Sequence, residues 1–327
     1  MMAKELDLYD RKILFALDIN SRTKAAAISR EIRLPKETVN FRIKRLLKNK
    51  YIHHFYTMIN ASKLGYGMHK IFLKFNNMTT EIEKQVIDFL LNEKTCANLR
   101  ITEGAYDICF LTMNKNPSEL KDFMCRFCKR FGEYLMQRSM HTLVSSIRLN
   151  QKFLYLGTSV RKTINHGDLG NYSLNKIELE IIKIISTNAR KKLVDIANET
   201  GQDPKVISYH IGKLEQNGII AGYFTALNAR LLNRSLVQVD IALRNPDKYL
   251  AIIEFFDHTG MCAFASEMLG RYDLTIELYV ENDLQLRKVM SKFKKSFGGY
   301  LIFYEVSRIY QEYVINWSPY DGYSSGK

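Results

Sequence analysis

Residues 33–50, RLPKETVNFRIKRLLKNK, decide how this sequence is interpreted. Val39, Ile43 and Leu46 recur at helical spacing and predict a helix with one buried stripe. Pro35 suits the first position of that helix, where its missing N–H has no partner to lose. The segment carries seven basic residues and one acidic residue, Glu37, so the remaining face of the helix is expected to be exposed and strongly cationic.

Two shorter helices are expected before this segment, over residues 6–19 and 24–31. Asp7 and Asp10 place negative charge at the start of the first, where the helix dipole favours it. After the basic helix, residues 51–59 read as an extended hairpin or wing. Two short helices joined by a tight turn are typical of a helix-turn-helix, whose second helix enters the DNA major groove.

Composition agrees with a polyanionic partner. The 327-residue chain has a net charge of +14 and a pI near 9.4, and nucleic acid is the commonest polyanion in the cytosol. No apolar stretch approaches the ~20 residues of a membrane span, and the N-terminus lacks a secretory signal, so a cytoplasmic protein is expected. The five cysteines are expected to be free thiols, since Cys125 and Cys128 have no second pair with which to bind zinc.

Specific roles can be predicted on the basic helix. Side chains near its N-terminal end would contact base edges and the later cations would contact phosphates. The base-edge candidates are Lys36, Thr38 and Asn40, and the phosphate candidates are Arg42, Lys44, Arg45 and Lys48. Arg33 in the preceding turn is a further DNA-binding candidate. The alternative is a merely solvated basic helix face.

An internal repeat sets the domain organisation. When the sequence is shifted by 168 positions, residues 13–64 align with residues 181–232 without a gap, and 14 of the 52 pairs are identical. Farther along, at a shift of 166, Gly104-Ala-Tyr106-Asp107 aligns with Gly270-Arg-Tyr272-Asp273. The chain is therefore expected to contain two tandem modules.

The second half of each module alternates apolar and polar residues with the period of a half-buried strand, as in residues 237–243 and 274–280. Helical stretches lie between these strands, in the order β-α-β-β-α-β of a ferredoxin-like sandwich. The predicted class is α+β, with two copies of a winged helix-turn-helix followed by this domain. The expected divisions are 1–62, 63–156, a Gly/Asn/His-rich linker 157–171, 172–230, 231–318 and a tail 319–327.

The second helix-turn-helix carries less positive charge than the first. Its DNA-binding candidates are Lys205, Ser208, Tyr209, His210 and Lys213, with Arg190 and Lys191 before its second helix as phosphate contacts. Gly212 within this helix lowers its stability by about 1 kcal/mol relative to Ala. We expect the second copy either to bind DNA more weakly or to serve mainly as scaffold.

The segments 34–46, 51–52, 56–60 and 64–65, together with the two Gly-x-Tyr-Asp motifs, resemble the Lrp/AsnC (feast/famine) family of regulators. The resemblance covers almost the whole chain twice, whereas ordinary members carry one module per chain. It implies a transcriptional regulator whose α/β domain dimerises, assembles further and often binds amino acids. In a tandem chain, the pairing of two α/β domains could be intramolecular, and further self-association of the chains is expected.

The resemblance also implies an effector pocket. Thr102, Gly104, Tyr106 and Asp107 would line it in the first copy, and Gly270, Arg271, Tyr272 and Asp273 in the second. An amino acid would place its carboxylate near Arg271 or a strand-edge amide, and its ammonium near Asp107 or Asp273. The residues alone equally allow a hairpin turn with a packed tyrosine, because glycine takes positive φ between strands.

The sequence predicts no enzyme and no cofactor, because it has no phosphate-binding glycine loop, no nucleophile elbow and no metal-spaced histidine cluster. The alternative is a sirohaem-decarboxylase-like enzyme, since that class resembles this architecture and pairs two such modules. It would need an anionic-tetrapyrrole pocket, for which His69, Arg100, Arg138 and His141 are candidates. That alternative leaves the dense basic helix unexplained.

Overall fold

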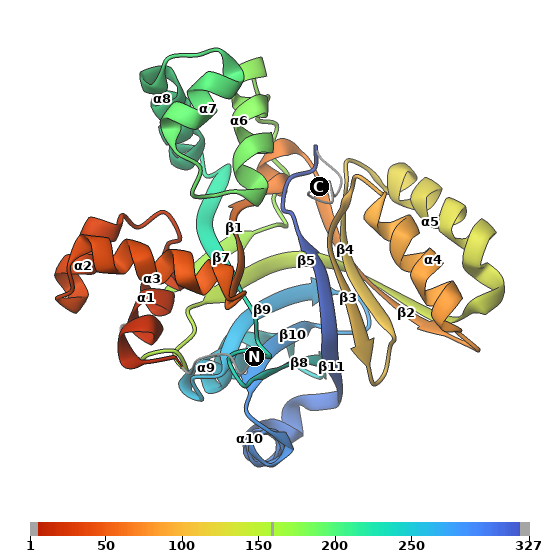
Figure 1. Cartoon of the computed structure of the whole chain (residues 1–327). Helices are drawn as coiled ribbons and strands as arrows, with labels where there is room; N and C mark the ends of the chain where they lie inside the picture. The colour runs from red at the N-terminus through yellow and green to blue at the C-terminus, as the bar shows by residue number, and fades with distance from the viewer. Residues whose placement is uncertain (1–5, 158–159, 321–327) are drawn as a thin grey trace.

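The computed structural model describes residues 6–157 and 160–320, and it repeats one order of elements in each half of the chain (Figure 1). The first half contains α1 (Leu8–Ile19), α2 (Ala25–Ile32), α3 (Lys36–Lys48), β1 (Ile52–Ile59), η1 (Ala61–Leu64), β2 (Gly67–Phe75), α4 (Thr80–Leu91), β3 (Cys96–Glu103), β4 (Ile108–Asn114), α5 (Pro117–Phe131) and β5 (Leu135–Leu149). The second half contains α6 (Lys176–Thr187), α7 (Leu193–Thr200), α8 (Pro204–Gln216), β7 (Ile220–Leu227), β8 (Ser235–Leu243), α9 (Tyr249–His258), β9 (Cys262–Leu269), β10 (Leu274–Val280), α10 (Asp283–Phe297) and β11 (Leu301–Ile315). We call α1–α3 with β1 winged helix 1, and α6–α8 with β7 winged helix 2; β2–β5 and β8–β11 bound α/β domains 1 and 2.

Both winged helices begin with the same capping device. In α1 the Asp10 N–H donates to Asp7 Oδ1 at 2.8 Å, and the Asp7 N–H donates back to Asp10 Oδ2 at 3.4 Å. Asn175 and Glu178 repeat this exchange at the start of α6. The device satisfies N–H groups that a helix start leaves without partners, and it fixes two carboxylates, those of Asp10 and Glu178.

The wings differ from the expected hairpin. Each winged helix supplies one strand, and β1 pairs antiparallel with β7 of the other copy. Tyr56 lies opposite Phe224, which is its own counterpart in the repeat, with ring centroids 5.8 Å apart. A pseudo-two-fold axis therefore passes between these two residues, as in an isologous dimer interface.

Hydrogen bonds exchanged across this axis join the two winged helices. Thr57 Oγ1 donates to the carbonyl of Ile185 at 2.6 Å, and its counterpart Thr225 donates to Leu17 at 2.7 Å. Arg22 Nη1 donates to the Ala189 carbonyl, and its counterpart Arg190 donates to the Ser21 and Thr23 carbonyls. These reciprocal bonds hold the two copies in one fixed relation within a single chain.

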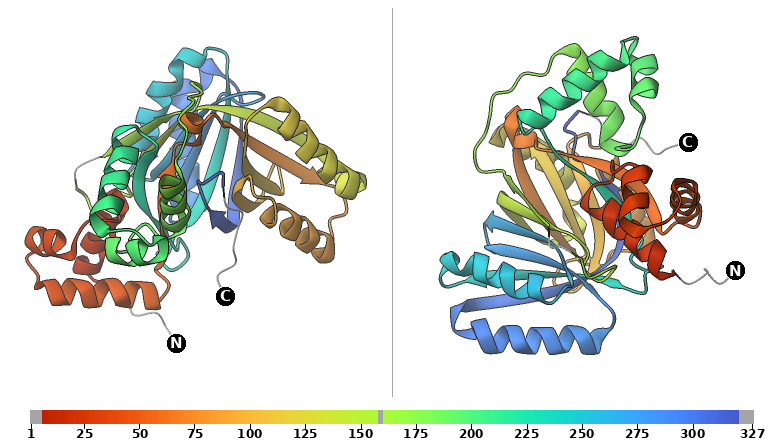
Figure 2. Two further views of the ribbon diagram at one scale, coloured as in Figure 1. Left: turned by 90° about the horizontal axis from the view of Figure 1, so that it is seen from above. Right: turned by 90° about the vertical axis from the view of Figure 1, so that its left-hand side faces the viewer.

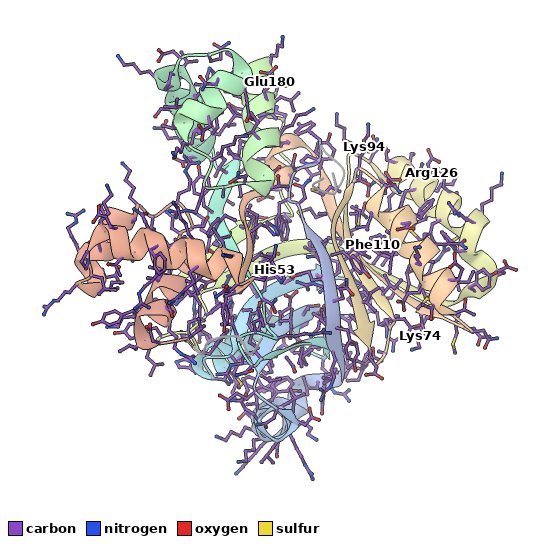
Figure 3. The ribbon with its side chains drawn as sticks, viewed as in Figure 1. His53, Lys74, Lys94, Phe110, Arg126 and Glu180 are labelled. Atoms are coloured by element: carbon purple, nitrogen blue, oxygen red, sulfur yellow. The ribbon has the colours of Figure 1, made fainter. Side chains whose placement is uncertain are left out.

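The two α/β domains share one sheet. Among the described residues, its nine strands run in the order β2-β4-β3-β11-β8-β10-β9-β5-β6, and an additional pairing of β2 with β5 closes the order on itself. The α4 and α5 helices cover one outer face and α9 and α10 another (Figures 1 and 2). The β-α-β-β-α-β order of each domain confirms the ferredoxin-like prediction, and each has an apolar core between its helices and its sheet. Phe110 of β4, labelled in Figure 3, belongs to the first of these cores.

The space enclosed between the two α/β domains is polar. Arg100 binds Glu277 at 2.5 Å and Glu312 at 2.7 Å, and Lys70 Nζ donates to Gln238 at 2.9 Å. A cavity of about 70 Å³ remains beside them. The cations belong to the first half of the chain and the carboxylates to the second, so ion pairs join the halves.

The expected linker 157–171 is not a simple linker. It contains β6 (Arg161–Asn165), which pairs antiparallel with Ser145–Leu149 of β5. The composition of residues 157–171 did not predict this strand, because the strand is defined by its pairing with β5, which lies outside the segment. Residues 321–327 of the expected tail lie outside the described residues.

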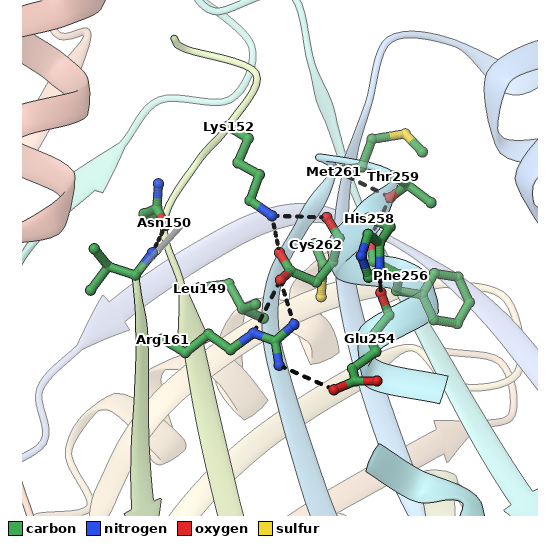
Figure 4. A network of polar contacts seen from close by, with 12 residues as sticks. Leu149, Asn150, Lys152, Arg161, Glu254, Phe256, His258, Thr259, Met261 and Cys262 are labelled. Atoms are coloured by element: carbon green, nitrogen blue, oxygen red, sulfur yellow. Dashed lines mark hydrogen bonds and ion pairs between the residues drawn. The ribbon is translucent and has the colours of Figure 1, made fainter. Parts of the chain in front are cut away.

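Ion pairs fasten this connection to α9 (Figure 4). Lys152 Nζ lies 2.6 Å from Asp257 Oδ1, and Arg161 Nη2 lies 2.7 Å from Asp257 Oδ2. Burial alone would raise the pKa of Asp257, but the hydrogen bonds from Lys152 and Arg161 hold it below its ordinary value. In the part of the chain that the structure describes, no helix has the length and apolarity needed to cross a bilayer.

Replacing Asp18 tests the joint between winged helix 1 and the sheet. The Asp18 carboxylate is fully buried, 2.5 Å from Arg148 of β5. Asp18→Asn should lower the free energy of unfolding by about 3–5 kcal/mol, because it leaves the Arg148 charge buried without its counter-ion. Chemical denaturation measures the loss. The control Asp7→Asn breaks a half-exposed pair with Arg42 and should cost less than about 1 kcal/mol; equal losses would contradict the assignment.

Candidate nucleic-acid interface

The α3 helix presents a cationic face to solvent. Lys36, Asn40, Lys44 and Lys48 are exposed, while the apolar stripe of the helix packs inward. Thr38 is half-buried, and Arg33 is exposed in the turn, where its φ of 57° ends α2. Both winged helices lie on the same side of the molecule, away from α4 and α5 (Figure 2). Three lysines and an amide thus share one accessible helix surface, which suits a polyanion.

Two predicted phosphate contacts instead brace the helix-turn-helix. Arg42 Nη1 lies 2.7 Å from Asp7 and 2.8 Å from Asp10, and Arg45 Nη2 lies 2.6 Å from Asp10. The Asp10 side chain is 2% exposed, so these guanidinium groups neutralise a buried carboxylate. Their charges tie α3 to α1, and their contact with DNA remains a prediction.

Winged helix 2 repeats this brace. His210 Nδ1 lies 3.3 Å and Lys213 Nζ 2.9 Å from Oε1 of Glu178. They occupy the repeat positions of Arg42 and Arg45. Burial raises the pKa of Glu178, but hydrogen bonds from Lys213 and from the Asn175 N–H outweigh this effect and lower it.

Arg190 and Lys191 are also engaged within the protein. Arg190 is half-buried between the two winged helices, where it donates to Ser21 and Thr23. Lys191 forms an ion pair with Glu199 of α7. The structure therefore does not bring these two side chains onto the exposed face of α8.

The two recognition helices differ in exposed charge. Lys205, Ser208 and Tyr209 are exposed on α8. At the positions of Lys44 and Lys48, however, α8 carries Gly212 and Gln216. The structure brings Lys205, Ser208 and Tyr209 together, as expected from the sequence, but on a less cationic surface.

Phe41 was not among the residues expected to contact DNA. Its side chain is 64% exposed on α3, and Tyr209 at the matching position of α8 is 67% exposed. An aromatic ring on a recognition helix can contact the methyl group of thymine. The repeat could have identified Phe41 as a candidate, because both copies carry a large aromatic residue at this position, which lies outside the buried apolar stripe of the helix.

The Gly-x-Tyr-Asp motifs lie where the two α/β domains meet. Gly104 and Gly270 have φ of 140° and 155°. A Cβ atom on Gly104 would lie 2.7 Å from the Val306 carbonyl oxygen, and one on Gly270 would lie 2.5 Å from the His141 ring. Close approach between the domains therefore requires both glycines.

The other residues of the motifs make internal contacts. Tyr106 and Tyr272 are buried, and Thr102 Oγ1 donates to the Tyr106 carbonyl at 2.8 Å. Asp107 accepts from the Phe75 N–H, as does Asp273 from the Leu243 N–H. Each aspartate thus connects its turn to the end of a neighbouring strand.

At this junction Arg271 lies on the solvent-accessible side and His141 on the buried side. Arg271 is 40% exposed and lies 3.0 Å from Glu305. His141 is buried and stacks on Tyr272, with centroids 5.0 Å apart and an interplanar angle of 17°. Burial, with a contribution from the nearby charge of Lys70, lowers the pKa of His141 to about 4.

The candidates for an anionic-tetrapyrrole pocket do not converge. Arg100 is neutralised by two glutamates inside the sheet, whereas Arg138 is exposed on β5 and contacts Cys128. His141 lies three residues beyond Arg138 on β5 and therefore on the opposite face, and His69 contacts Thr142 at 3.3 Å. Within the described ranges, no cluster of His, Cys, Asp and Glu could hold a metal ion.

Comparisons with known families find the helix-turn-helix in both halves. The AsnC-type helix-turn-helix domain matches residues 6–47, and the winged helix-turn-helix DNA-binding model matches residues 174–221. An uncharacterized HTH-type transcriptional regulator of Pyrococcus horikoshii is 35% identical over 120 residues, which are 37% of this chain and 75% of that protein. The leucine-responsive regulatory protein of Haemophilus influenzae is 25% identical over 126 residues, 37% of this chain and 74% of its own.

A sirohaem decarboxylase is among the solved structures that cover both halves together. The crystal structure of a sirohaem decarboxylase superimposes on 95% of this chain and 95% of its own, with a TM-score of 0.63 and 12% identity. At that identity the similarity concerns the fold, and it shows that the tandem arrangement is a shared architecture.

The buried His141 predicts a pH dependence of stability. Its folded-state pKa of about 4 lies below the unfolded value near 6.5, so the unfolded state binds the proton first. Stability is retained above about pH 6.5 and falls as the pH drops toward 4, by about 1.4 kcal/mol per pH unit for each such group. Denaturation of His141→Phe should show one proton less of this dependence. His166, whose pKa burial also lowers to about 4, should keep its share; an unchanged slope in His141→Phe would contradict the assignment.

Proposed function

This chain belongs to the Lrp/AsnC family of helix-turn-helix transcriptional regulators, and we propose that it binds duplex DNA sequence-specifically through two unequal recognition helices. The observation that carries the proposal is the exposed face of α3. Lysines stand beside an amide and an aromatic ring there, on a helix braced from behind by Arg42 and Arg45. This face combines groups that bind phosphates with groups that distinguish bases.

In this proposal, some α3 side chains contact base edges and others contact phosphates. Lys36, Asn40 and Phe41, with the half-buried Thr38, contact base edges, and Lys44 and Lys48 contact phosphates. Lys205, Ser208 and Tyr209 form the smaller contact of α8. Arg42, Arg45, His210 and Lys213 act first by holding their helices, because contact with DNA would require them to share the carboxylates that they now neutralise.

The fixed pairing of β1 with β7 supports recognition of an asymmetric operator. Operator symmetry normally mirrors protein symmetry. Here the two recognition helices carry different exposed residues, although a pseudo-two-fold axis relates them. One chain therefore presents two different half-site surfaces in a defined relation.

We further propose that an amino acid or similar small molecule binds at the junction of the α/β domains. A bound amino acid would replace the Arg271–Glu305 ion pair, with its carboxylate on Arg271 and its ammonium on Glu305. Asp107 and Asp273 accept backbone N–H groups, whereas Glu305 accepts from the side chains of Arg271 and Tyr272, which favours Glu305 for that role. Exposed Met136 and Leu269 lie on strands adjoining this junction, and we propose that chains associate further through this surface.

The DNA proposal predicts unequal effects of charge removal. Lys44→Ala with Lys48→Ala should weaken binding to all duplexes by about tenfold or more and should reduce the salt slope by about 2, since each lost phosphate contact removes about 0.9. Lys205→Ala should have a smaller effect. The measurement is a salt titration of duplexes selected from a random library.

Matched charge removal on a distant helix controls for net charge. Lys288 and Lys292 are exposed on α10, and replacing both with Ala should leave DNA affinity nearly unchanged. Equal losses in the two double variants would show that only net charge matters. Failure to retain any duplex at about 100 mM salt would refute the function itself.

The effector proposal predicts a ligand-dependent thermal shift. One or more of the twenty amino acids should raise the melting temperature, because a ligand that binds the folded state alone stabilises it. Arg271→Gln should abolish the shift, whereas Arg244→Gln, on an arginine of the same domain that donates to the Leu301 carbonyl, should retain it. A screen without any response would overturn the effector proposal while leaving DNA binding intact.

A further inference from the structure

The chain fills one of two equivalent clefts with its own connector. Beyond β6, the connector continues between η1 and β5. The Gly170 N–H donates to the Ser62 carbonyl at 2.8 Å, and the Tyr172 N–H donates to the Lys63 carbonyl at 3.1 Å. On the other side, the His166 and Gly167 N–H groups donate to the Val144 carbonyl at 2.8 and 3.0 Å. This connector therefore pairs with the edge of β5 and covers it.

The equivalent cleft in the second half is open. Its volume is about 540 Å³, within the range of ligand sites, and it lies between the winged helices and β11. Its lining includes His53, Arg230, Arg234, Arg308, Tyr310 and Glu312. His53, labelled in Figure 3, comes from β1 on the side of winged helix 1. In the repeat, Arg230 corresponds to Ser62, and Tyr310 to Val144.

The open cleft exposes an edge of β11. The β8 strand pairs with β11 only as far as Ile309, and β3 occupies the opposite edge. Among the described strands, none covers the β8-side edge beyond Ile309 as β6 covers that of β5. Arg230 Nη2 donates to the Tyr310 carbonyl at 3.1 Å. In the filled cleft, the equivalent carbonyl oxygen, that of Val144, accepts from backbone N–H groups of the connector. In the open cleft, the Tyr310 carbonyl oxygen accepts from the Arg230 side chain.

The open cleft is also more cationic than the filled one. Arg230, Arg234 and Arg308 stand at the positions of Ser62, Tyr66 and Thr142. Arg234 and Arg308 pair with Glu281 and Asp283, whose side chains are 53% and 76% exposed. The Arg308–Asp283 pair is exposed on both sides, so it contributes little and exchanges readily, whereas the Arg234 side chain is only 14% exposed and remains in its pair. Glu312 of the lining is already bound by Arg100, so the cleft keeps an excess of positive charge.

We propose that the open edge of β11 binds an extended acidic segment of a partner protein as an added antiparallel strand. The occupied cleft provides the template, since β6 pairs with β5 in this way over five residues. Strand addition to an open edge is a common mode of peptide binding, in which the backbone gives affinity and the side chains give specificity. The accessible side chains of Arg230 and Arg308 select acidic side chains. Tyr320, the last described residue, packs against Tyr66 on the side of the filled cleft.

A peptide-binding experiment on the full chain tests this proposal. The probe is a fluorescein-labelled decapeptide of alternating Thr and Glu, and affinity is measured by anisotropy. It should bind, slow hydrogen exchange of the amides of residues 311–313, and lose about tenfold in affinity in Arg230→Gln/Arg308→Gln. Its Thr/Lys counterpart and an N-methylated version, which cannot pair as a strand, should not bind.

Matched variants separate this cleft from other cationic surfaces. Arg126→Gln removes an exposed arginine of α5, which is paired with Glu93, and should leave peptide affinity unchanged. Operator binding should survive Arg230→Gln/Arg308→Gln, which distinguishes this proposal from the proposed DNA binding. Absence of peptide binding would overturn the proposal. So would equal loss in Arg126→Gln, exchange protection on α3 instead of β11, or the same protection by free citrate, which would indicate a small-anion site.

Discussion

The backbone pairing of β1 with β7 is the constraint on which the rest of the molecule depends. It places Tyr56 opposite its own counterpart Phe224 and so imposes a two-fold relation on two unequal sequences. Because strands pair at a spacing of about 4.8 Å, little freedom remains between the winged helices. The exchange of strand partners between the α/β domains follows the same axis, with β5 and β11 each crossing to the other domain. Two separate one-module chains could form these strand pairs only by dimerising, whereas this chain forms them within one molecule.

Much of this architecture could be predicted from the sequence, because repeats and periodicity are local signals. The repeat of residues 13–64 indicated two modules, and period-two alternation indicated the ferredoxin-like strands. Residues 51–59 are extended as predicted, but they form one strand paired with β7 and not a hairpin, since strand partners distant in sequence leave no local mark. The same reason hid β6 in the expected linker. The sequence predicted Arg42 and Arg45 to be phosphate contacts, because it does not show that the fold places the buried Asp10 carboxylate within ion-pair distance of both.

The duplication allowed corresponding positions to take different roles. Ser62 packs against a connector, while Arg230 at the same place lines an open cleft. Lys44 faces solvent on α3, while its counterpart in α8 is Gly212. In a homodimer each substitution would appear on both sides of the axis at once. In this chain, one side can keep the structural role of a position while the other acquires a new contact.

The distribution of buried charge determines which halves of the chain can pair with each other. Lys70 and Arg100 come from the first half, and Asp240, Glu277 and Glu312 from the second. If two first halves from different chains paired, Lys70 would face a second Lys70 where it now meets Gln238, at a cost of several kcal/mol. Two second halves would leave Asp240, Glu277 and Glu312 without the Lys70 and Arg100 cations that now lie beside them. Each half is therefore matched to the other half of its own chain, and a homodimer of either half would require different interior charges.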